Sequence, residues 1–209
     1  MNTLEQLLVD CPTLFRGGQT AAPAGAFLST GHPELDALLP GGGWPLGSLI
    51  EVQTPTPGLA EIRLLLPALR RLQRESRHVI WTDPPFPPYA PGLVQAGLDL
   101  ARLLWIAPAT PADLWWCAEK LLRHPACGAV MAWPARCPQT VLRRLQLAVE
   151  AGGGLGIVFL RQVAATSPAA VRLQLEYQGA HLWVSVRRAR GSWKQGRIRL
   201  GRADVPATA

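Results

Sequence analysis

Residues 49–69, LIEVQTPTPGLAEIRLLLPAL, predict a strand, a tight turn and a helix in direct succession. The apolar run 49–52 has the character of a core strand, and Pro57 suits the first turn of a helix that Thr56 can cap. Pro67 interrupts this helix, but the apolar pattern continues past it, so we expect one kinked helix rather than two. A strand that leads through a short turn into a helix is the local geometry on which many proteins hold a phosphate group.

The turn lacks the residues that would use this geometry. In a nucleotide-binding P-loop, backbone N–H groups cradle the phosphates, a Lys reaches the β- and γ-phosphates, and a Ser or Thr hydroxyl holds the metal ion. Here Ala60 and Glu61 occupy the last two positions, so one side chain has no charge and the other repels a triphosphate. Pro55 and Pro57 each remove an amide donor. We therefore expect no tight ATP binding, no ATPase activity and no cofactor.

An α/β ATPase also needs an acid that organises a metal ion, and the positions where such an acid is expected do not provide a suitable one. The apolar run 129–133 should end in an acid if it organised a metal ion, but it ends in Trp133 and is followed by Pro134. Asp83 follows another apolar run, and the prolines after it form a stiff loop with few donors, so we interpret Asp83 as a turn residue. The four histidines accompany no recognisable Ser or Cys nucleophile motif, which disfavours a hydrolase.

Composition predicts one domain with short appendages. The chain has 209 residues and 48% hydrophobic content, enough for one sizeable core. No apolar run approaches the length of a membrane span, and acids near the N-terminus are unlike a signal peptide, so we expect a cytosolic protein without membrane contact. Cys11, Cys117, Cys127 and Cys137 show no C-x-x-C spacing, so we expect free thiols, no zinc site and no structural disulfide.

Strands and helices alternate along the middle of the chain. Further apolar runs of strand length lie at 78–82, 103–107, 129–133 and 156–160, with helical segments between them at 89–97, 111–123 and 138–150. Because these strands are apolar throughout, helices should cover both faces of their sheet, as in a mainly parallel, doubly wound α/β fold. Residues 171–177 and 181–188 alternate polar with apolar and predict an antiparallel hairpin at one edge.

We therefore divide the chain into three parts. Residues 1–27 are an N-terminal helical arm and linker, residues 28–170 are an α/β core that lacks a functional P-loop, and residues 171–209 are a C-terminal β-hairpin and basic tail. In the arm, Leu4, Leu7 and Leu8 share one face of a short amphipathic helix. This helix either packs on its own domain or docks on a partner.

Tryptophan is frequent, with eight in the chain. We expect most of them in the core, but Trp115 and Trp116 are our first candidates for contacts with a partner. Aromatic side chains are enriched at binding hot spots because each buries a large area and has few torsions to freeze.

A basic block lies near the C-terminus. No acid occurs between residues 187 and 202, and 7 of the 21 Lys and Arg residues lie there, which leaves 14 basic against 14 acidic residues elsewhere. The seven residues are Arg187, Arg188, Arg190, Lys194, Arg197, Arg199 and Arg202. Trp193 lies among them, so stacking could add to phosphate attraction. The block is either a solvated tail or a contact for nucleic acid or an acidic partner.

Several motifs resemble the core of the RecA recombinase. Residues 29–52, STGHPELDALLPGGGWPLGSLIEV, are similar to the segment that opens that core, and residues 89–104 are similar to the element in which a Tyr-Ala helix leads to Gly-x-Asp and a strand. Residues 126–133 resemble its Walker B strand. Residues 156–162 resemble the strand that ends in a nucleotide-sensing Gln, which would be Gln162 here. The RecA loop that binds DNA after that Gln is long, whereas only residues 163–170 precede the hairpin here.

Within that superfamily the chain resembles the ImuA family more closely. The shared motifs are PGGGWP at 40–45, GLAEIRLLLPAL at 58–69, PPYAP at 87–91, ACGAV at 126–130 and RRLQLAVEAG at 143–152. Together they cover about residues 28–162. ImuA proteins act with the inactive polymerase-like protein ImuB and an error-prone replicative-type polymerase in damage-induced translesion synthesis.

The resemblance implies a RecA-like core at 28–170 and a non-catalytic adaptor of the bacterial SOS mutasome. It implies an ImuB-like protein as a partner, with RecA, an error-prone polymerase subunit and DNA as further candidates. It also implies a homo-oligomer and a cytoplasmic protein that associates with the nucleoid when active. One alternative is a SulA-like inhibitor of cell division that binds the tubulin-like division protein. Another is an ATPase with an unusual site that uses Gln162.

Overall fold

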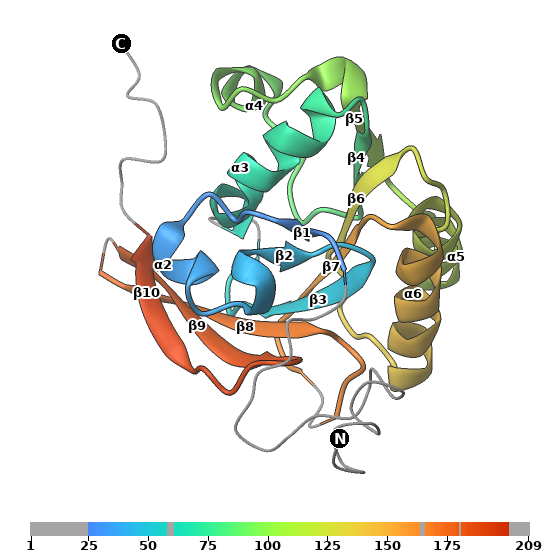
Figure 1. Cartoon of the computed structure of the whole chain (residues 1–209). Coiled ribbons are helices and arrows are strands. Elements are labelled where there is room, and N and C mark those ends of the chain that lie inside the picture. Colours follow the sequence, from blue (N-terminus) through green and yellow to red (C-terminus); the bar gives the residue numbers. More distant parts are fainter. Residues whose placement is uncertain (1–24, 58–60, 164–165, 180, 201–209) are drawn as a thin grey trace, which may run out of the picture.

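An eight-stranded sheet forms the centre of the molecule (Figure 1). The computed structural model describes residues 25–57, 61–163, 166–179 and 181–200. The strands follow the order β10-β9-β8-β3-β7-β6-β4-β5 across the sheet. Their bounds are β3 Ser48–Gln53, β4 His78–Thr82, β5 Leu103–Ile106, β6 Cys127–Ala132, β7 Leu155–Leu160, β8 Val171–Gln178, β9 His181–Ala189 and β10 Gly196–Leu200.

Strands β3 to β8 pair with one another in parallel. Strand β9 pairs antiparallel with β8 on one side and with β10 on the other. The β8–β9 hairpin joins the sheet beside β3, where Ile50 lies opposite Val171 on one side and Ile157 on the other. The mainly parallel α/β sheet with an antiparallel C-terminal hairpin is therefore confirmed. Part of the expected basic tail differs, because residues 196–200 form the strand β10.

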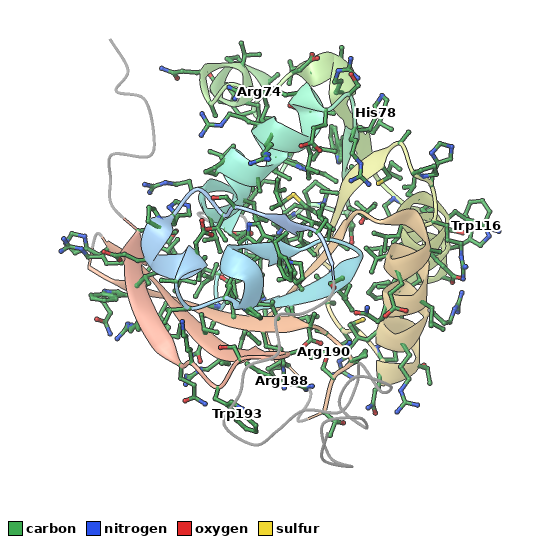
Figure 2. The ribbon with its side chains drawn as sticks, in the orientation of Figure 1. Arg74, His78, Trp116, Arg188, Arg190 and Trp193 are labelled. Atoms are coloured by element: carbon green, nitrogen blue, oxygen red, sulfur yellow. The ribbon has the colours of Figure 1, made fainter. Side chains whose placement is uncertain are left out.

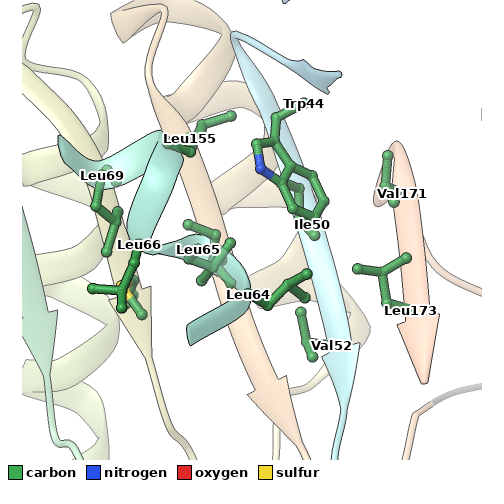
Figure 3. Packing of buried hydrophobic residues seen from close by; sticks show 14 of the residues in the cluster. Trp44, Ile50, Val52, Leu64, Leu65, Leu66, Leu69, Leu155, Val171 and Leu173 are labelled. Carbon is green, nitrogen blue, oxygen red and sulfur yellow. The ribbon is translucent and has the colours of Figure 1, made fainter. Parts of the chain in front are cut away.

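The first face of the sheet carries α3, Glu61–Arg74, and the N-terminal elements (Figure 1). These elements are β1 Phe27–Leu28, α2 Pro33–Asp36, a 3-10 turn η1 at Pro40–Gly42, and β2 Trp44–Pro45. Between this layer and the sheet lies the larger core cluster, in which leucines of α3 meet Ile50, Val52 and Leu155 (Figure 3). Trp44 is fully buried in the same cluster and lies over the β3 side of it.

Helix α3 passes through Pro67 as a single helix, as the apolar pattern predicts. A side chain at Gly31 would come within 2.3 Å of the Cβ atom of Pro67, so the proline ring lies directly against Gly31. Gly31 also has a φ of 80°, which an L side chain rarely adopts. Pro57 lies in a turn before residues 58–60, so the described helix begins at Glu61 rather than at Pro57.

The second face carries α5, Pro111–Leu122, and α6, Gln139–Gly152, which bury a smaller core cluster against the sheet (Figure 1). Glu119 of α5 joins the two helices, since its carboxylate accepts hydrogen bonds from Arg144 of α6 and from Arg123 at the end of α5. Connecting elements are α4, Ala90–Gln95, and a 3-10 turn η2 at Leu100–Arg102, which leads into β5. Within the described ranges, no helix has the length and apolarity needed to cross a membrane.

Candidate functional site

The position of a P-loop hydroxyl is occupied by Glu61, whose side chain is buried. It is only 1% exposed, and its Oε1 atom accepts a hydrogen bond of 2.9 Å from the indole Nε1 of Trp133. Trp133 directly follows β6, where an acid that organises a metal ion would stand. The two positions that depart from a working nucleotide site are therefore in direct contact with each other.

Aromatic packing fixes this tryptophan in place. Its ring stacks on Phe159 of β7 with centroids 4.7 Å apart and an interplanar angle of 17°. It also meets Trp81 of β4 edge to face, with centroids 5.9 Å apart. Strands β4 and β7 and the residue that follows β6 thus contribute one aromatic side chain each, and the cluster lies near the carboxyl ends of these strands, at the start of α3. The hydrogen bond anchors Glu61 against the hydrophobic core. An indole N–H is a donor only, so Trp133 supplies neither a metal ligand nor a group for proton transfer.

A tyrosine at the end of β8 lies within the electrostatic influence of this carboxylate. Burial raises the pKa of Tyr177, the negative charge of Glu61 raises it further, and the nearby Arg63 partly opposes both effects. Tyr177 is still 41% exposed, so its side chain remains in contact with solvent. Gln162, the sensor-like residue, is exposed beyond β7, and Ala60 lies outside the described residues.

Asp83 forms a turn, as the sequence indicates. Its φ is 53°, in the left-handed region, and its amide donates to the carbonyl of Ile106 over 3.0 Å. The side chain lines an open cavity of about 380 Å³ that also includes Thr110, Trp115 and Arg136. Thr110 and Asp113 form a capping box at the start of α5, which already satisfies the first amides of that helix.

The two tryptophans of α5 have different environments. Trp115 is half-buried, packs against the smaller core cluster and lines the cavity beside Asp83. Trp116 is 60% exposed and projects from the outer side of α5 (Figure 2). Of this pair, Trp116 is the one whose surface is available for a partner.

Exposed apolar side chains also occur in β5 and in the two elements before it, and among the described strands β5 pairs with β4 alone. Leu104 is 45% and Trp105 is 53% exposed, and they point to opposite faces because they are consecutive in a strand. Exposed Val94 of α4 and Leu100 of η2 belong to the elements that precede this strand. We call these four residues the apolar edge. An edge strand with apolar side chains on both faces is a surface that soluble proteins normally protect.

The basic block predicted from the sequence divides among several elements. Arg187 and Arg188 lie in β9, Arg190 and Lys194 follow it, Arg197 and Arg199 lie in β10, and Arg202 lies outside the described residues. Lys194 is directed to the carbonyl of Ala37 at the end of α2, 3.0 Å away. Residues 196–200 form a strand because Ile198 and Leu200 enter the larger core cluster while Arg197 and Arg199 remain outside. The sequence GRIRL alternates polar with apolar residues, and this alternation is the local pattern that indicates a strand.

The arm residues Leu4, Leu7 and Leu8 also lie outside the described residues.

Sequence reasoning missed a buried ion pair. Glu51 in the centre of β3 is fully buried, and its carboxylate lies 2.9 Å from the Nε atom of Arg172, its register partner in β8. An acid inside the apolar run LIEV was the signal that a basic partner should lie beside it.

Comparison with known proteins agrees with this architecture. The family model described as "Cell division inhibitor SulA" matches residues 47–156, which is more than half of the chain, so the chain belongs to this family of α/β proteins. It is 33% identical over 151 residues to "Protein ImuA" of Caulobacter vibrioides, covering 70% of this chain and 61% of that protein. The resemblance to ImuA that the sequence motifs indicate is thereby confirmed.

Similarity to cell division inhibitors is lower. The chain is 28% identical over 96 residues to "Cell division inhibitor SulA" of Yersinia pestis, covering 46% of this chain and 57% of that protein. For the same protein of Serratia marcescens, the identity is 26% over 103 residues, covering 49% of this chain and 61% of that protein. The chain spans about three-fifths of the length of these curated relatives.

Proposed function

We propose that this chain is a non-catalytic adaptor in error-prone translesion DNA synthesis, with a RecA-like core that has lost its nucleotide site. The observation that carries the proposal is the Glu61–Trp133 hydrogen bond in a chain similar to ImuA. A carboxylate held at the start of α3 repels phosphate oxygens, and an indole after β6 supplies no metal ligand. The scaffold then acts through its surfaces.

The partner surfaces in this proposal are the apolar edge and Trp116. Large apolar side chains that are exposed together support protein contact, because a partner strand or helix can bury them and pair the free edge of β5. The proposed partners are an ImuB-like protein first, then RecA, an error-prone polymerase subunit and a second copy of the chain. The proposed location is the bacterial cytoplasm, in association with the nucleoid during the response to DNA damage.

Two experiments test the proposal. Titration of the purified chain with ATP and Mg²⁺ in a calorimeter should give no binding in the micromolar range. Micromolar affinity that is lost on Gln162→Ala would instead support an ATPase and overturn the non-catalytic role. In cells, deletion of the gene should lower damage-induced mutation frequency, and Trp105→Lys should fail to restore it while Leu147→Lys, on an exposed position of α6, should restore it.

A second candidate function is inhibition of cell division, which the match to the SulA family model favours. In this role the same surface would bind a tubulin-like division protein. Co-sedimentation of the purified chain with polymers of that protein, and filamentation of cells that overproduce the chain, would support this candidate over the adaptor.

A further inference from the structure

The C-terminal part of the sheet has one covered face and one open face. Leu173, Val184 and Ile198 of β8, β9 and β10 are buried in the larger core cluster on the first face. On the second face, α6 packs on β3 and β7, and α5 packs on β6. Figure 1 shows both helices at the far end of the sheet from β9 and β10. The side chains that alternate with the buried ones therefore face outward, and we call this surface the open sheet face.

Strand register identifies the residues of the open sheet face. Arg197 lies opposite Ser185, Arg199 lies opposite Trp183, and these strand neighbours share a face. Arg172, beside Glu51, belongs to the same face, and Arg188 lies opposite it. The open sheet face thus collects residues from 172 to 199 that are not adjacent in the sequence.

A register shift adds a further arginine to this surface. The β8–β9 pairing is irregular between Arg172 and Leu173, where Arg188 and Val186 are the partners, so Arg187 is the extra residue. In a β-bulge of this kind, two consecutive side chains can project on one side of the strand. Arg187 donates to the Oε1 atom of Gln174 on the open face over 2.5 Å, and both Arg187 and Arg188 are exposed.

Among the described residues, Arg187, Arg188 and Arg199 on this surface have no ion pair with an acid. Arg188 donates to the carbonyl of Ser167 over 3.2 Å, and Arg190 donates to the carbonyl of Pro168 over 2.8 Å. A carbonyl orients a guanidinium group and leaves its full charge in place. Glu176, a half-buried acid on this face, pairs with Arg197 at 3.3 Å. Arg190 also lines a cavity with Phe27 and Pro45 of the covered face. Arg187, Arg188 and Arg199 are therefore the arginines of the open sheet face that remain available to an anion.

Aromatic rings accompany this charge. Trp193, in the turn between β9 and β10, is 88% exposed, and Figure 2 shows it on the same side of the molecule as Arg188 and Arg190. The ring of Trp183 is covered by the guanidinium of Arg197, 4.4 Å from its centroid. Of these two rings, Trp193 is the more exposed, and it lies on the same side of the molecule as Arg188.

We propose that the open sheet face binds single-stranded nucleic acid. Arg187, Arg188 and Arg199 contact phosphates along the strand, and Trp193 stacks on an unpaired base. The exposed tryptophan distinguishes this ligand from an acidic protein, which needs only the charges, and from a duplex, whose bases are already stacked. The inference does not depend on the proposed role in translesion synthesis, because it concerns a property of the purified chain.

Fluorescence anisotropy of a labelled 20-nucleotide oligo-dT tests the proposal with the full chain at 50 and 200 mM salt. The double variant Arg187→Ala/Arg199→Ala should weaken binding at least tenfold and reduce the dependence of affinity on salt, since about 0.7 units of log–log slope are lost with each phosphate contact. Trp193→Ala should weaken binding about tenfold and leave the salt slope unchanged, as expected for a lost stacking contact.

The matched control is Arg71→Ala/Arg74→Ala, which removes the same charge from exposed positions in the last turn of α3. Figure 2 shows Arg74 at the opposite end of the molecule from Trp193. It should bind within twofold of the unmodified chain. Equal losses in both double variants would mean attraction by net charge alone and would overturn the proposal. Displacement of the oligo-dT by poly-Glu at equal charge concentration, or equal affinity for a 20-base-pair duplex, would also overturn it. Circular dichroism confirms that each variant is folded.

Discussion

The indole of Trp133 and the carboxylate of Glu61 are hydrogen-bonded over 2.9 Å although the two residues are 72 positions apart in the chain. This bond connects the end of β6 to the start of α3. It also explains how an acid is accommodated at a position that is 1% exposed, because a buried carboxylate requires a donor.

Trp133→Phe should therefore destabilise the fold. The substitution keeps an aromatic ring but removes the donor to Glu61, and a lost hydrogen bond to a buried charged group costs about 2 kcal/mol. Urea unfolding followed by circular dichroism measures the change in free energy of unfolding. Trp116→Phe, at a position that is 60% exposed, is the control and should change the free energy by less than about 0.5 kcal/mol. Equal effects of the two substitutions would contradict a role for the bond.

The Glu51–Arg172 ion pair should couple the C-terminal hairpin to the parallel strands. Arg172→Met leaves a fully buried carboxylate without this partner and should cost about 3–5 kcal/mol. Adding Glu51→Met to that variant should recover most of the loss, because no charge then remains buried at the site. Urea midpoints of the two single variants and the double variant complete the cycle. Additive losses in the double variant would show that the pair is not the cause.

Glu119 should make stability depend on acidity. Burial acts to raise the pKa of this carboxyl, but hydrogen bonds and charges from Arg144 and Arg123 outweigh burial and hold the pKa below its usual 4.5. The stabilisation is therefore present above pH 4.5 and is lost as the pH falls through the lowered pKa. Glu119→Gln should cost about 1 kcal/mol at pH 7 and less at pH 3, as measured by thermal unfolding at both values. A constant cost at both pH values would exclude this linkage.

Two thiols should be unreactive in the folded chain. Burial raises the pKa of Cys127 to about 12, and burial together with the negative charge of Glu51 raises the pKa of Cys137 to about 12. At pH 8 only about one thiol in ten thousand is then a thiolate, which is the reactive form. Iodoacetamide should modify the buried Cys127 at least a hundredfold faster in 8 M urea than in buffer, and the half-buried Cys137 by a smaller factor, as peptide mass spectrometry can measure. Comparable rates in the two conditions would be inconsistent with burial.

The apolar edge should contribute to protein contact. Trp105→Lys places a charge on the exposed edge strand, and the loss of an aromatic anchor typically weakens binding by about 2 kcal/mol, or roughly thirtyfold. Pull-down of a purified ImuB-like protein and light scattering of the chain alone measure hetero- and self-association separately. Leu147→Lys, on an exposed position of α6, is the matched control and should leave both unchanged. Unchanged association in Trp105→Lys would remove the apolar edge from the proposed function.

The sequence predicts regular elements here better than it predicts their contacts. The strand at 49–52 and the helix through Pro67 follow from local periodicity, and the hairpin at 171–188 follows from alternation. Glu61 and Trp133 were each recognisable as departures from a nucleotide site, but their contact depends on strand order across the sheet, which no local pattern records. Strand β10 is hard to predict from the sequence because its two arginines continue the basic block. The alternating Ile198 and Leu200 are the residues that indicate a strand.

The position of β3 has a consequence for synthesis of the chain. Both of its neighbours, β7 and β8, are encoded about a hundred residues later than β3 itself. During translation, β3 and the leucine-rich helix α3 emerge from the ribosome before β7 and β8 have been synthesised, so β3 cannot yet form its native strand pairs. Chaperone dependence during translation, and inclusion-body formation when expression is rapid, are the expected result of that delay.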